Sequence, residues 1–303
     1  MTDIHPSGWQ WSRAFGINDL GQAVGYGQFT DGNLHAYEWD NGAINDLHKA
    51  GYKDSWAYGI DDAGAVISGV ASLSGGVMHT VEWNNGYLTD LHPRGTLWSR
   101  SRGMNASHDL SGLAMLSPGA THAFIWKNNG DKLDINPSGW NDTYAYSINN
   151  SGNAAGYGKP AAGGFHAFLW SNNTFNDIHV SGYGSTWARN INDNDVIVGE
   201  AVLTSGVSHA MMWKNGAATD LHPSAWSESH ARGVNMNGTV AGDAQLSTGE
   251  IHAGVWRNGT FFDINPSGWT ESHGYAINSS GQIAGWGALS TGEIRAFVLT
   301  PVN

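Results

Sequence analysis

Two neighbouring parts of the chain place a carboxylate and an imidazole two residues apart. These are Glu228 with His230 and Glu271 with His273, and Arg232 follows the first pair. A positioned carboxylate and imidazole can transfer protons in catalysis or bind a cation. One hypothesis is therefore acid–base cleavage of a polysaccharide, with either histidine as the proton carrier and the nearby glutamate orienting it. The alternative is a solvated, charged rim.

The arginines near this cluster extend the hypothesis to an acidic substrate, whose acidic group Arg232 and Arg189 would hold. Two further acidic residues belong to the same part of the chain, Glu250 before His252 and Glu293 before Arg295. The chain contains no G-x-S-x-G, H-E-x-x-H or Walker motif. An enzymatic activity therefore depends on this cluster alone.

A second set of candidates recurs at one position of a repeated unit: Trp9, Tyr52, Trp140, Tyr183, Trp226 and Trp269. Sugar rings stack on aromatic side chains, and their hydroxyls need polar partners such as those of Gly/Ser/Thr-rich loops. Weak sites repeated on one face also gain avidity. The pattern favours a non-catalytic, multivalent, lectin-like function with a glycan or polysaccharide partner, with Arg189 and Arg232 in the ligand-binding set. Packing between units and a protein-interaction scaffold remain open alternatives.

The chain also repeats histidines in two series. The first is His35, His79, His122, His166, His209 and His252, with Arg295 in the last unit, and the second is His5, His48, His92, His179 and His222. Symmetry would hold such residues too far apart to share one ion, whose ligand bonds are about 2 Å long. We therefore expect no metal and no cofactor, and predict hydrogen bonds to nearby Ser, Thr or Asp side chains.

The elements that must position these residues follow from the repeat itself. One unit opens with D-[IL]-[HN] at Asp3, Asp46, Asp90, Asp134, Asp177, Asp220 and Asp263. In the first unit we predict strands at 12–18, 22–27, 34–39 and 43–48, separated by Gly, Asn and Asp turns. Four short strands in about 43 residues are typical of one propeller blade.

The two ends of the sequence are in register with each other. The next repeat after Asp263 would open at 306, which is three positions past the length of 303, and the chain begins its own unit at Asp3. We therefore predict an all-β, single-domain, seven-bladed β-propeller over residues 1–303. Its ring is closed by the N-terminal strand, with residues 1–5 pairing beside 295–299 to complete the last blade.

The run S-x-A-x-G-I-N-x-x-G-Q-x-x-G followed by H-A-F-x-W-x-N-G, as at His122 to Phe124 and His166 to Phe168, resembles the HAF-type repeat proteins. The resemblance covers the whole chain. It implies a propeller fold and a bacterial, secreted or cell-surface protein. Here D-[IL]-[HN]-P-S-G-W replaces the Gly-rich D-L-G segment typical of that family.

The outermost strand completes the ring, so the first strand of each unit must line the axis. Large residues that differ between units flank its small residue: Arg13 and Phe15, Trp56 and Tyr58, Arg100 and Arg102, Tyr144 and Tyr146, Trp187 and Arg189, His230 and Arg232, and His273 and Tyr275. This pattern predicts a polar, aromatic lining near the axis. Arg–aromatic packing is the equally open structural alternative.

Composition limits the partners. A formal net charge of −12 argues against nucleic acid and anionic membranes as partners. The absence of Cys removes disulfides and thiolate metal sites. No apolar run is long enough to span a membrane, and the first residues, MTDIHPSGW, lack the features of a signal peptide.

Overall fold

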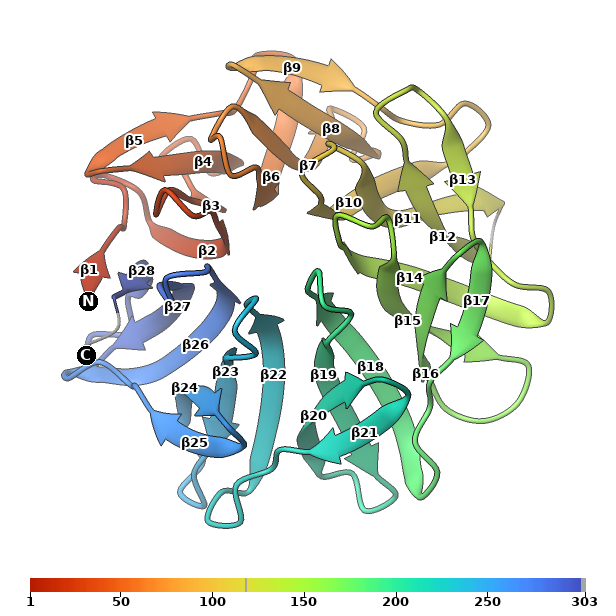
Figure 1. The fold of residues 1–303 in the computed structure, drawn as a ribbon. Coiled ribbons are helices and arrows are strands. Elements are labelled where there is room, and N and C mark those ends of the chain that lie inside the picture. Colours follow the sequence, from red (N-terminus) through yellow and green to blue (C-terminus); the bar gives the residue numbers. More distant parts are fainter. Residues whose placement is uncertain (118, 301–303) are drawn as a thin grey trace.

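The computed structural model describes residues 1–117 and 119–300. Within these residues the chain forms 28 strands and no helix, so none is present that could span a membrane. The strands form antiparallel units of four, in the spatial order β2-β3-β4-β5 for the first complete unit. Figure 1 shows these units side by side around a central opening, the arrangement of a β-propeller.

The first strand of every unit lies innermost. These strands are β2 (Trp11–Ile17), β6 (Tyr52–Ile60), β10 (Trp98–Met104), β14 (Trp140–Ile148), β18 (Tyr183–Ile191), β22 (Glu228–Val234) and β26 (Trp269–Ile277). The second strands are β3 (Ala23–Gln28), β7 (Val66–Leu73), β11 (Leu110–Ser117), β15 (Ala154–Pro160), β19 (Ile197–Leu203), β23 (Val240–Gln245) and β27 (Ile283–Leu289).

The third strands are β4 (Leu34–Asp40), β8 (Met78–Asn84), β12 (Ala120–Trp126), β16 (His166–Ser171), β20 (Ser208–Lys214), β24 (Ile251–Arg257) and β28 (Ile294–Leu299). The outermost are β5 (Ala43–Asp46), β9 (Tyr87–Asp90), β13 (Lys132–Asp134), β17 (Thr174–Asp177), β21 (Ala217–Asp220), β25 (Thr260–Asp263) and β1 (Thr2–Asp3). The strands predicted for the first unit agree within two residues.

The N-terminal strand belongs to the sheet that ends the chain. In β1, Thr2 pairs with Val298 and Asp3 with Phe297, both on β28. Two other units join into one eight-stranded sheet through a single parallel bridge between Thr121 and Asp142. The pairing of β1 with β28 places the first and last strands side by side, as Figure 1 shows.

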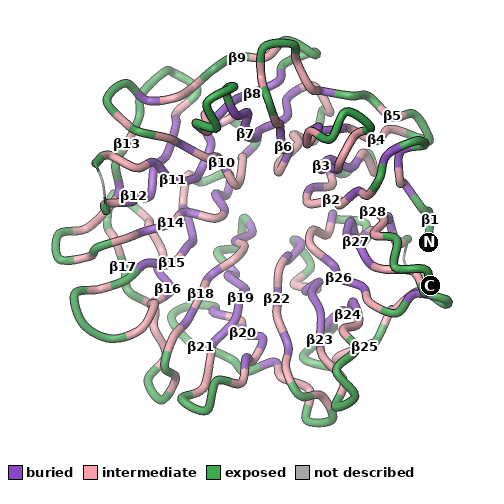
Figure 2. Tube along the Cα trace, turned by 180° about the vertical axis from the view of Figure 1, so that it is seen from behind, coloured by how far each residue is buried: buried purple, intermediate pink, exposed green. Residues whose placement is uncertain are grey.

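The core lies between the units, where small and aliphatic residues of facing strands pack. Figure 2 shows buried segments along the inner and middle strands, and exposed turns at the periphery. Ala57 of β6, for example, packs with Val24, Ala36 and Trp83, all of which are buried. Small residues on the inner strands let neighbouring units approach, because a Cβ at Gly16 would lie 2.8 Å from the carbonyl oxygen of Tyr58.

A buried hydroxyl on each inner strand links its unit to the one before. Thr186 Oγ1 accepts the backbone N–H of Ala167 at 2.8 Å and contacts His179 Nδ1 at 3.0 Å. The equivalent hydroxyls bind the preceding unit in the same way at Ser12, Ser55, Ser99, Thr143, Ser229 and Ser272.

Thr186→Val tests this link, because valine keeps the shape of threonine but leaves the N–H of Ala167 buried without a partner. We expect the free energy of unfolding to fall by about 1–3 kcal/mol in denaturant titrations. Thr204→Val, in an exposed turn of the same unit, is the matched control. Equal stability of the two variants would contradict the structural role of the hydroxyl.

Candidate active site

Each inner strand carries a β-bulge at the same position, and the residue inside each bulge faces the axis. The antiparallel register shifts between Ala188 and Asn190, for example, so that Arg189 is the extra residue. Bulges re-aim side chains and are frequent beside active sites. The residues at these bulges, called the axial ring below, are Phe15, Tyr58, Arg102, Tyr146, Arg189, Arg232 and Tyr275.

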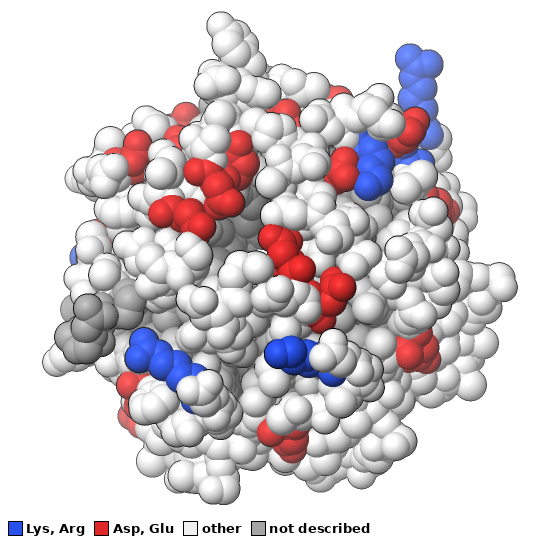
Figure 3. All heavy atoms as spheres, in the orientation of Figure 1, with Lys and Arg blue, Asp and Glu red and all other residues white. Residues whose placement is uncertain are grey.

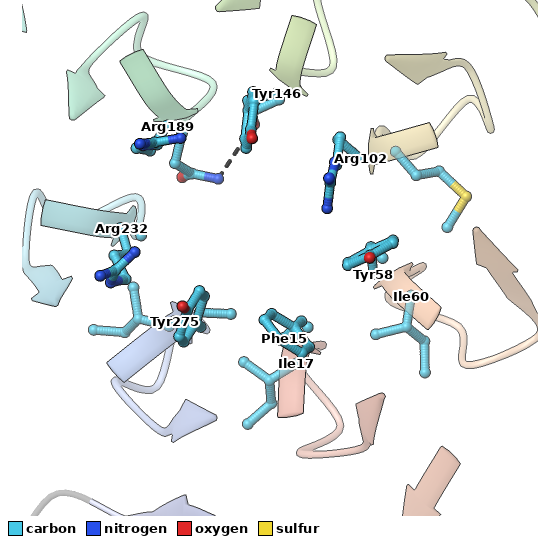
Figure 4. A pocket seen from close by; sticks show the side chains of 18 of the residues that line it. Phe15, Ile17, Tyr58, Ile60, Arg102, Tyr146, Arg189, Arg232 and Tyr275 are labelled. Carbon is cyan, nitrogen blue, oxygen red and sulfur yellow. Dashed lines mark hydrogen bonds between the residues drawn. The ribbon is translucent and has the colours of Figure 1, made fainter. Parts of the chain in front are cut away.

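The axial ring surrounds a central cavity of about 430 Å³. Figure 4 shows its seven side chains around the opening, together with Ile17 and Ile60. Two residues after the axial ring on each strand, aliphatic residues such as Ile17, Ile60 and Val234 line both this cavity and a second one. The cavity therefore has a polar, aromatic wall and an aliphatic floor.

One buried carboxylate beside this wall gathers three of the predicted residues. Asp243 on β23 is 1% exposed. Its Oδ1 lies 2.9 Å from His230 Nδ1, its Oδ2 accepts Arg232 Nε at 2.5 Å, and His273 Nδ1 lies 3.2 Å from Oδ2. Burial alone would raise the pKa of Asp243, but Arg232 and the two imidazoles hold it well below its usual range.

The two histidines of this network differ in what they can do. Asp243 occupies Nδ1 of His230, whose side chain is 25% exposed, and no described residue bonds to its Nε2. Both ring nitrogens of His273 lie beside carboxylates, since Nε2 is 2.7 Å from Glu271 Oε1, and its side chain is 8% exposed. His230 is thus the histidine arranged for proton transfer, whereas His273 is held in place.

The structure divides the sequence-predicted cluster. Glu271 joins the network through His273. The carboxylate of Glu228, on the same strand as His230, has no hydrogen bond or ion pair to a described residue, so it does not orient the imidazole. Glu250 bonds to Thr248 in an exposed turn, and Glu293 bonds to Arg295 at the outer rim.

Sequence reasoning missed Asp243 and its counterpart Glu200. Both are acidic residues within the second strands of their units, each at the fourth position of a run that is otherwise small or apolar, I-V-G-E-A or V-A-G-D-A. Each forms an ion pair with an arginine of the adjoining inner strand, Glu200 with Arg189 and Asp243 with Arg232. An acidic residue in a buried strand beside an inner-strand arginine was the available signal.

The inner strands carry more arginines than Glu200 and Asp243 can neutralise. Five of the eight arginines lie there, Arg13, Arg100, Arg102, Arg189 and Arg232. Within residues 1–117 and 119–300, only the last two of them form ion pairs. Acidic side chains lie near the middle of the face in Figure 3. Of the five, Arg102, Arg189 and Arg232 line the central cavity, and because Arg102 has no ion pair with a described residue the wall is cationic inside an acidic protein, which suits an anionic ligand.

The aromatic residues predicted to stack on sugars have partners inside the protein. Trp9 is 9% exposed and Trp269 is 7% exposed. Trp9 packs edge-on against Tyr37 with 5.7 Å between ring centroids, and Trp269 against Phe297 at 5.5 Å. The remaining members are partly buried, namely Tyr52, Trp140, Tyr183 and Trp226.

The histidines of both series are hydrogen-bonded, as the sequence predicts. His35 Nδ1 lies 2.8 Å from Asp46 Oδ2, and His48 Nδ1 lies 3.0 Å from Ser55 Oγ. The two rings stack with centroids 4.0 Å apart, and three further pairs repeat this stack. Among the described residues, no group of three or more His, Asp or Glu is arranged to hold a metal ion.

Comparisons with known proteins identify the fold. No family model and no curated protein matches the chain. Among solved structures, the β-propeller domain of the Trilobed protease from Pyrococcus furiosus is 10% identical, with a TM-score of 0.67, over 96% of this chain and 93% of that one. An oligogalacturonate lyase from Vibrio parahaemolyticus is 9% identical, with a TM-score of 0.62, over 98% and 90%.

A structure from a study of two prolyl endopeptidases is 10% identical, with a TM-score of 0.64, over 97% of this chain. This chain spans 51%, about half, of that protein's length. At such identities the likeness shows that the chain has the β-propeller fold.

The lectin-like function expected from the sequence is wrong. The similar structures are mainly peptidases, including puromycin hydrolases, together with the lyase, although a lectin from Burkholderia pseudomallei is also similar. The packing of Trp9 and Trp269 gives the physical reason, because a ring that is already covered offers no face to a sugar.

The second histidine series makes stability depend on pH. Burial, chiefly, lowers the pKa of these imidazoles below the ordinary 6.5, and for four of them the stacked histidine lowers it further; the residues are His5, His48, His92, His179 and His222. The unfolded chain therefore binds these protons more readily than the folded protein. Stability should be complete above about pH 6.5 and should decrease as the pH falls below it.

The control variant replaces each of these histidines by Asn, because Asn136 and Asn265 occupy the same position in two units and bond to the hydroxyl there. Replacing all five histidines by Asn should flatten the dependence of the melting temperature on pH between 7 and 5. An equally steep dependence in that variant would show that other groups cause it.

Proposed function

We propose that this protein is an enzyme that cleaves an anionic saccharide by acid–base chemistry in the central cavity. The observation that carries the proposal is the convergence of His230, His273 and Arg232 on the buried Asp243 carboxylate. This network adjoins the cationic wall of the cavity, which Arg232 itself lines.

Each residue has a distinct part in the proposed reaction. Asp243 accepts from Nδ1 of His230 and leaves Nε2 to exchange a proton with the substrate. Glu271 and His273 hold the carboxylate from the other side. Arg232 and Arg189, each fixed by a buried carboxylate, attract the acidic group of the saccharide into the cavity.

The similarity in fold to an oligogalacturonate lyase supports an acidic oligosaccharide as the first substrate to test. A glycan or polysaccharide remains the proposed partner. We also propose that the protein is bacterial and is secreted or on the cell surface. The only support for this proposal is the resemblance of the sequence to HAF-type repeat proteins.

His230→Gln should lower kcat on an acidic oligosaccharide by at least about 100-fold, because general acid–base catalysis contributes factors of about 10²–10⁴. His252→Gln, whose parent imidazole contacts Asp263 at the outer rim, is the control and should keep full activity. Oligogalacturonate and a neutral oligosaccharide of equal length would be assayed by mass spectrometry. Equal activity of the two variants would exclude His230 as the proton carrier.

We also propose that the units are seven blades of a closed ring. Support comes from the pairing of β1 with β28, and from two hydrogen bonds that join the last unit to the first. Ala296 N donates to Ser12 Oγ at 3.1 Å, and Asn278 Nδ2 donates to the backbone oxygen of Asn18 at 2.9 Å.

Deleting residues 1–5 tests this closure. It removes the strand that pairs with β28 and exposes the edge that β1 covers, so the melting temperature should fall markedly. Deleting residues 300–303, which follow the last strand in the sequence, provides a control of similar length. Unchanged melting after removal of residues 1–5 would contradict the closed ring.

A further inference from the structure

Arg102 differs from the other arginines of the axial ring in having no carboxylate partner. Glu200 holds Arg189, and Asp243 holds Arg232. Among the described residues, no carboxylate lies within 4.0 Å of the Arg102 guanidinium, and its buried Nε has no hydrogen-bond partner. Because Arg102 lines the central cavity, its charge is available to an anionic ligand there.

Tyr146 lies between this arginine and the next one in the ring. The guanidinium carbons of Arg102 and Arg189 lie 5.4 and 5.1 Å from the centroid of its ring. Its hydroxyl lies 3.5 Å from that of Tyr157. In the sheet, Tyr157 pairs with Tyr144, which precedes Tyr146 by two residues on β14. Figure 4 shows Tyr146 at the edge of the opening, with Arg102 and Arg189 on either side.

The charges around Tyr146 distinguish it from the tyrosines beside it. Burial alone would raise its pKa, but Arg102 and Arg189, with the hydrogen bond to Tyr157, bring the pKa of Tyr146 below its ordinary value. Burial raises the pKa of Tyr144, and the nearby Asp142 raises it further. Tyr146 is therefore the phenol on this strand that ionises more easily.

We propose that Tyr146 is the catalytic base of a β-elimination, removing the proton on the carbon next to a uronate carboxylate that Arg102 binds. The proposal rests on the function proposed above, and specifies both its substrate class, a uronate-containing oligosaccharide, and its type of reaction.

The step balances without any co-reactant. The Tyr146 phenolate takes the proton from C5 of the uronate, and the C–H electron pair forms the C4=C5 double bond. The bond from C4 to the glycosidic oxygen breaks with its electron pair on oxygen, which takes a proton from the His230 imidazolium. Solvent then removes the Tyr146 proton and returns one to His230. No water is consumed, and nothing is oxidised or reduced.

The position of His230 along β22 suits this division of roles. His230 precedes Arg232 of the axial ring by two residues, which is about 6–7 Å along a strand. An acidic group held at the axial ring would thus leave the glycosidic oxygen nearer the level of His230. Neutralising the carboxylate with Arg102 also lowers the cost of the negative charge that develops on it when C5 loses its proton.

The experiment compares products and rates on oligogalacturonate. The wild-type protein should release an unsaturated product, which is lighter by one water than the hydrolysis product and absorbs in the ultraviolet. Tyr146→Phe should lower kcat by at least about 100-fold. Tyr144→Phe, on the same strand, should stay within about twofold of the wild type, and circular dichroism would establish that both variants fold.

A second measurement separates catalysis from a structural role. The rising limb of kcat/KM with pH should follow ionisation of Tyr146, and Arg102→Gln should move that limb to higher pH while raising KM. Arg102→Lys should restore part of both. An unmoved limb, or full activity of Tyr146→Phe, would overturn the role of Tyr146.

The outcomes also separate this inference from the function on which it rests. Saturated products from oligogalacturonate would overturn the β-elimination and leave acid–base cleavage in place. If the folded protein cleaves neither oligogalacturonate, oligomannuronate nor a neutral oligosaccharide, the proposed function fails and the inference fails with it.

Discussion

The structure depends on one buried hydrogen-bonded contact, the hydroxyl by which each inner strand holds the preceding unit. A backbone N–H of the third strand would otherwise be buried without a partner at the interface. The same hydroxyl binds a histidine or asparagine of its own unit, as Thr143 does with Asn136 at 2.8 Å. Each hydroxyl therefore fixes the inner strand against both its own outer loop and the neighbouring unit.

This contact also sets where the axial ring lies. In every unit the residue of the axial ring follows the hydroxyl by three positions, as Arg189 follows Thr186 and Tyr146 follows Thr143. Because side chains alternate between faces, a residue three positions on points away from the interface and toward the axis. The bulge at this point accommodates the large side chain without disturbing the hydroxyl contact.

The repeat explains why the fold was predictable. Its turns and its alternating small residues place four strands per unit, and the strands at 12–18 and 22–27 agree with β2 and β3 within one residue. The residues that vary between units, such as Arg102 and Tyr275, left a polar, aromatic lining of the axis and Arg–aromatic packing equally open, and the structure shows both.

The candidate site was less predictable because it depends on contacts across strands. The proximity of His230 and Arg232 in sequence was visible, but Asp243, which joins them, comes from another strand. The stacking hypothesis failed for a related reason. A recurring Trp9 or Trp269 looks the same in sequence whether its face is open or covered by Tyr37 or Phe297.

The central cavity and the second cavity beyond its aliphatic floor differ in charge, so the two sides of the axial ring are not equivalent for a charged ligand. Beyond the aliphatic floor, side-chain amides bridge neighbouring units, as where Asn149 Nδ2 donates to the Asn192 backbone oxygen at 3.0 Å. In one unit an aspartate, Asp61, stands where the others have this asparagine.

Four aspartates line the second cavity, beyond the aliphatic floor: Asp19, Asp61, Asp62 and Asp193. Burial, chiefly, and the nearby Asp19 raise the pKa of Asp62, as expected where carboxylates crowd together. The negative charge at this end repels anions, and the aliphatic residues separate the acidic residues from the arginines of the axial ring. On the proposed function, an anionic saccharide would therefore reach the arginines of the axial ring from the opposite side, the side on which His230 lies, with its acidic group first.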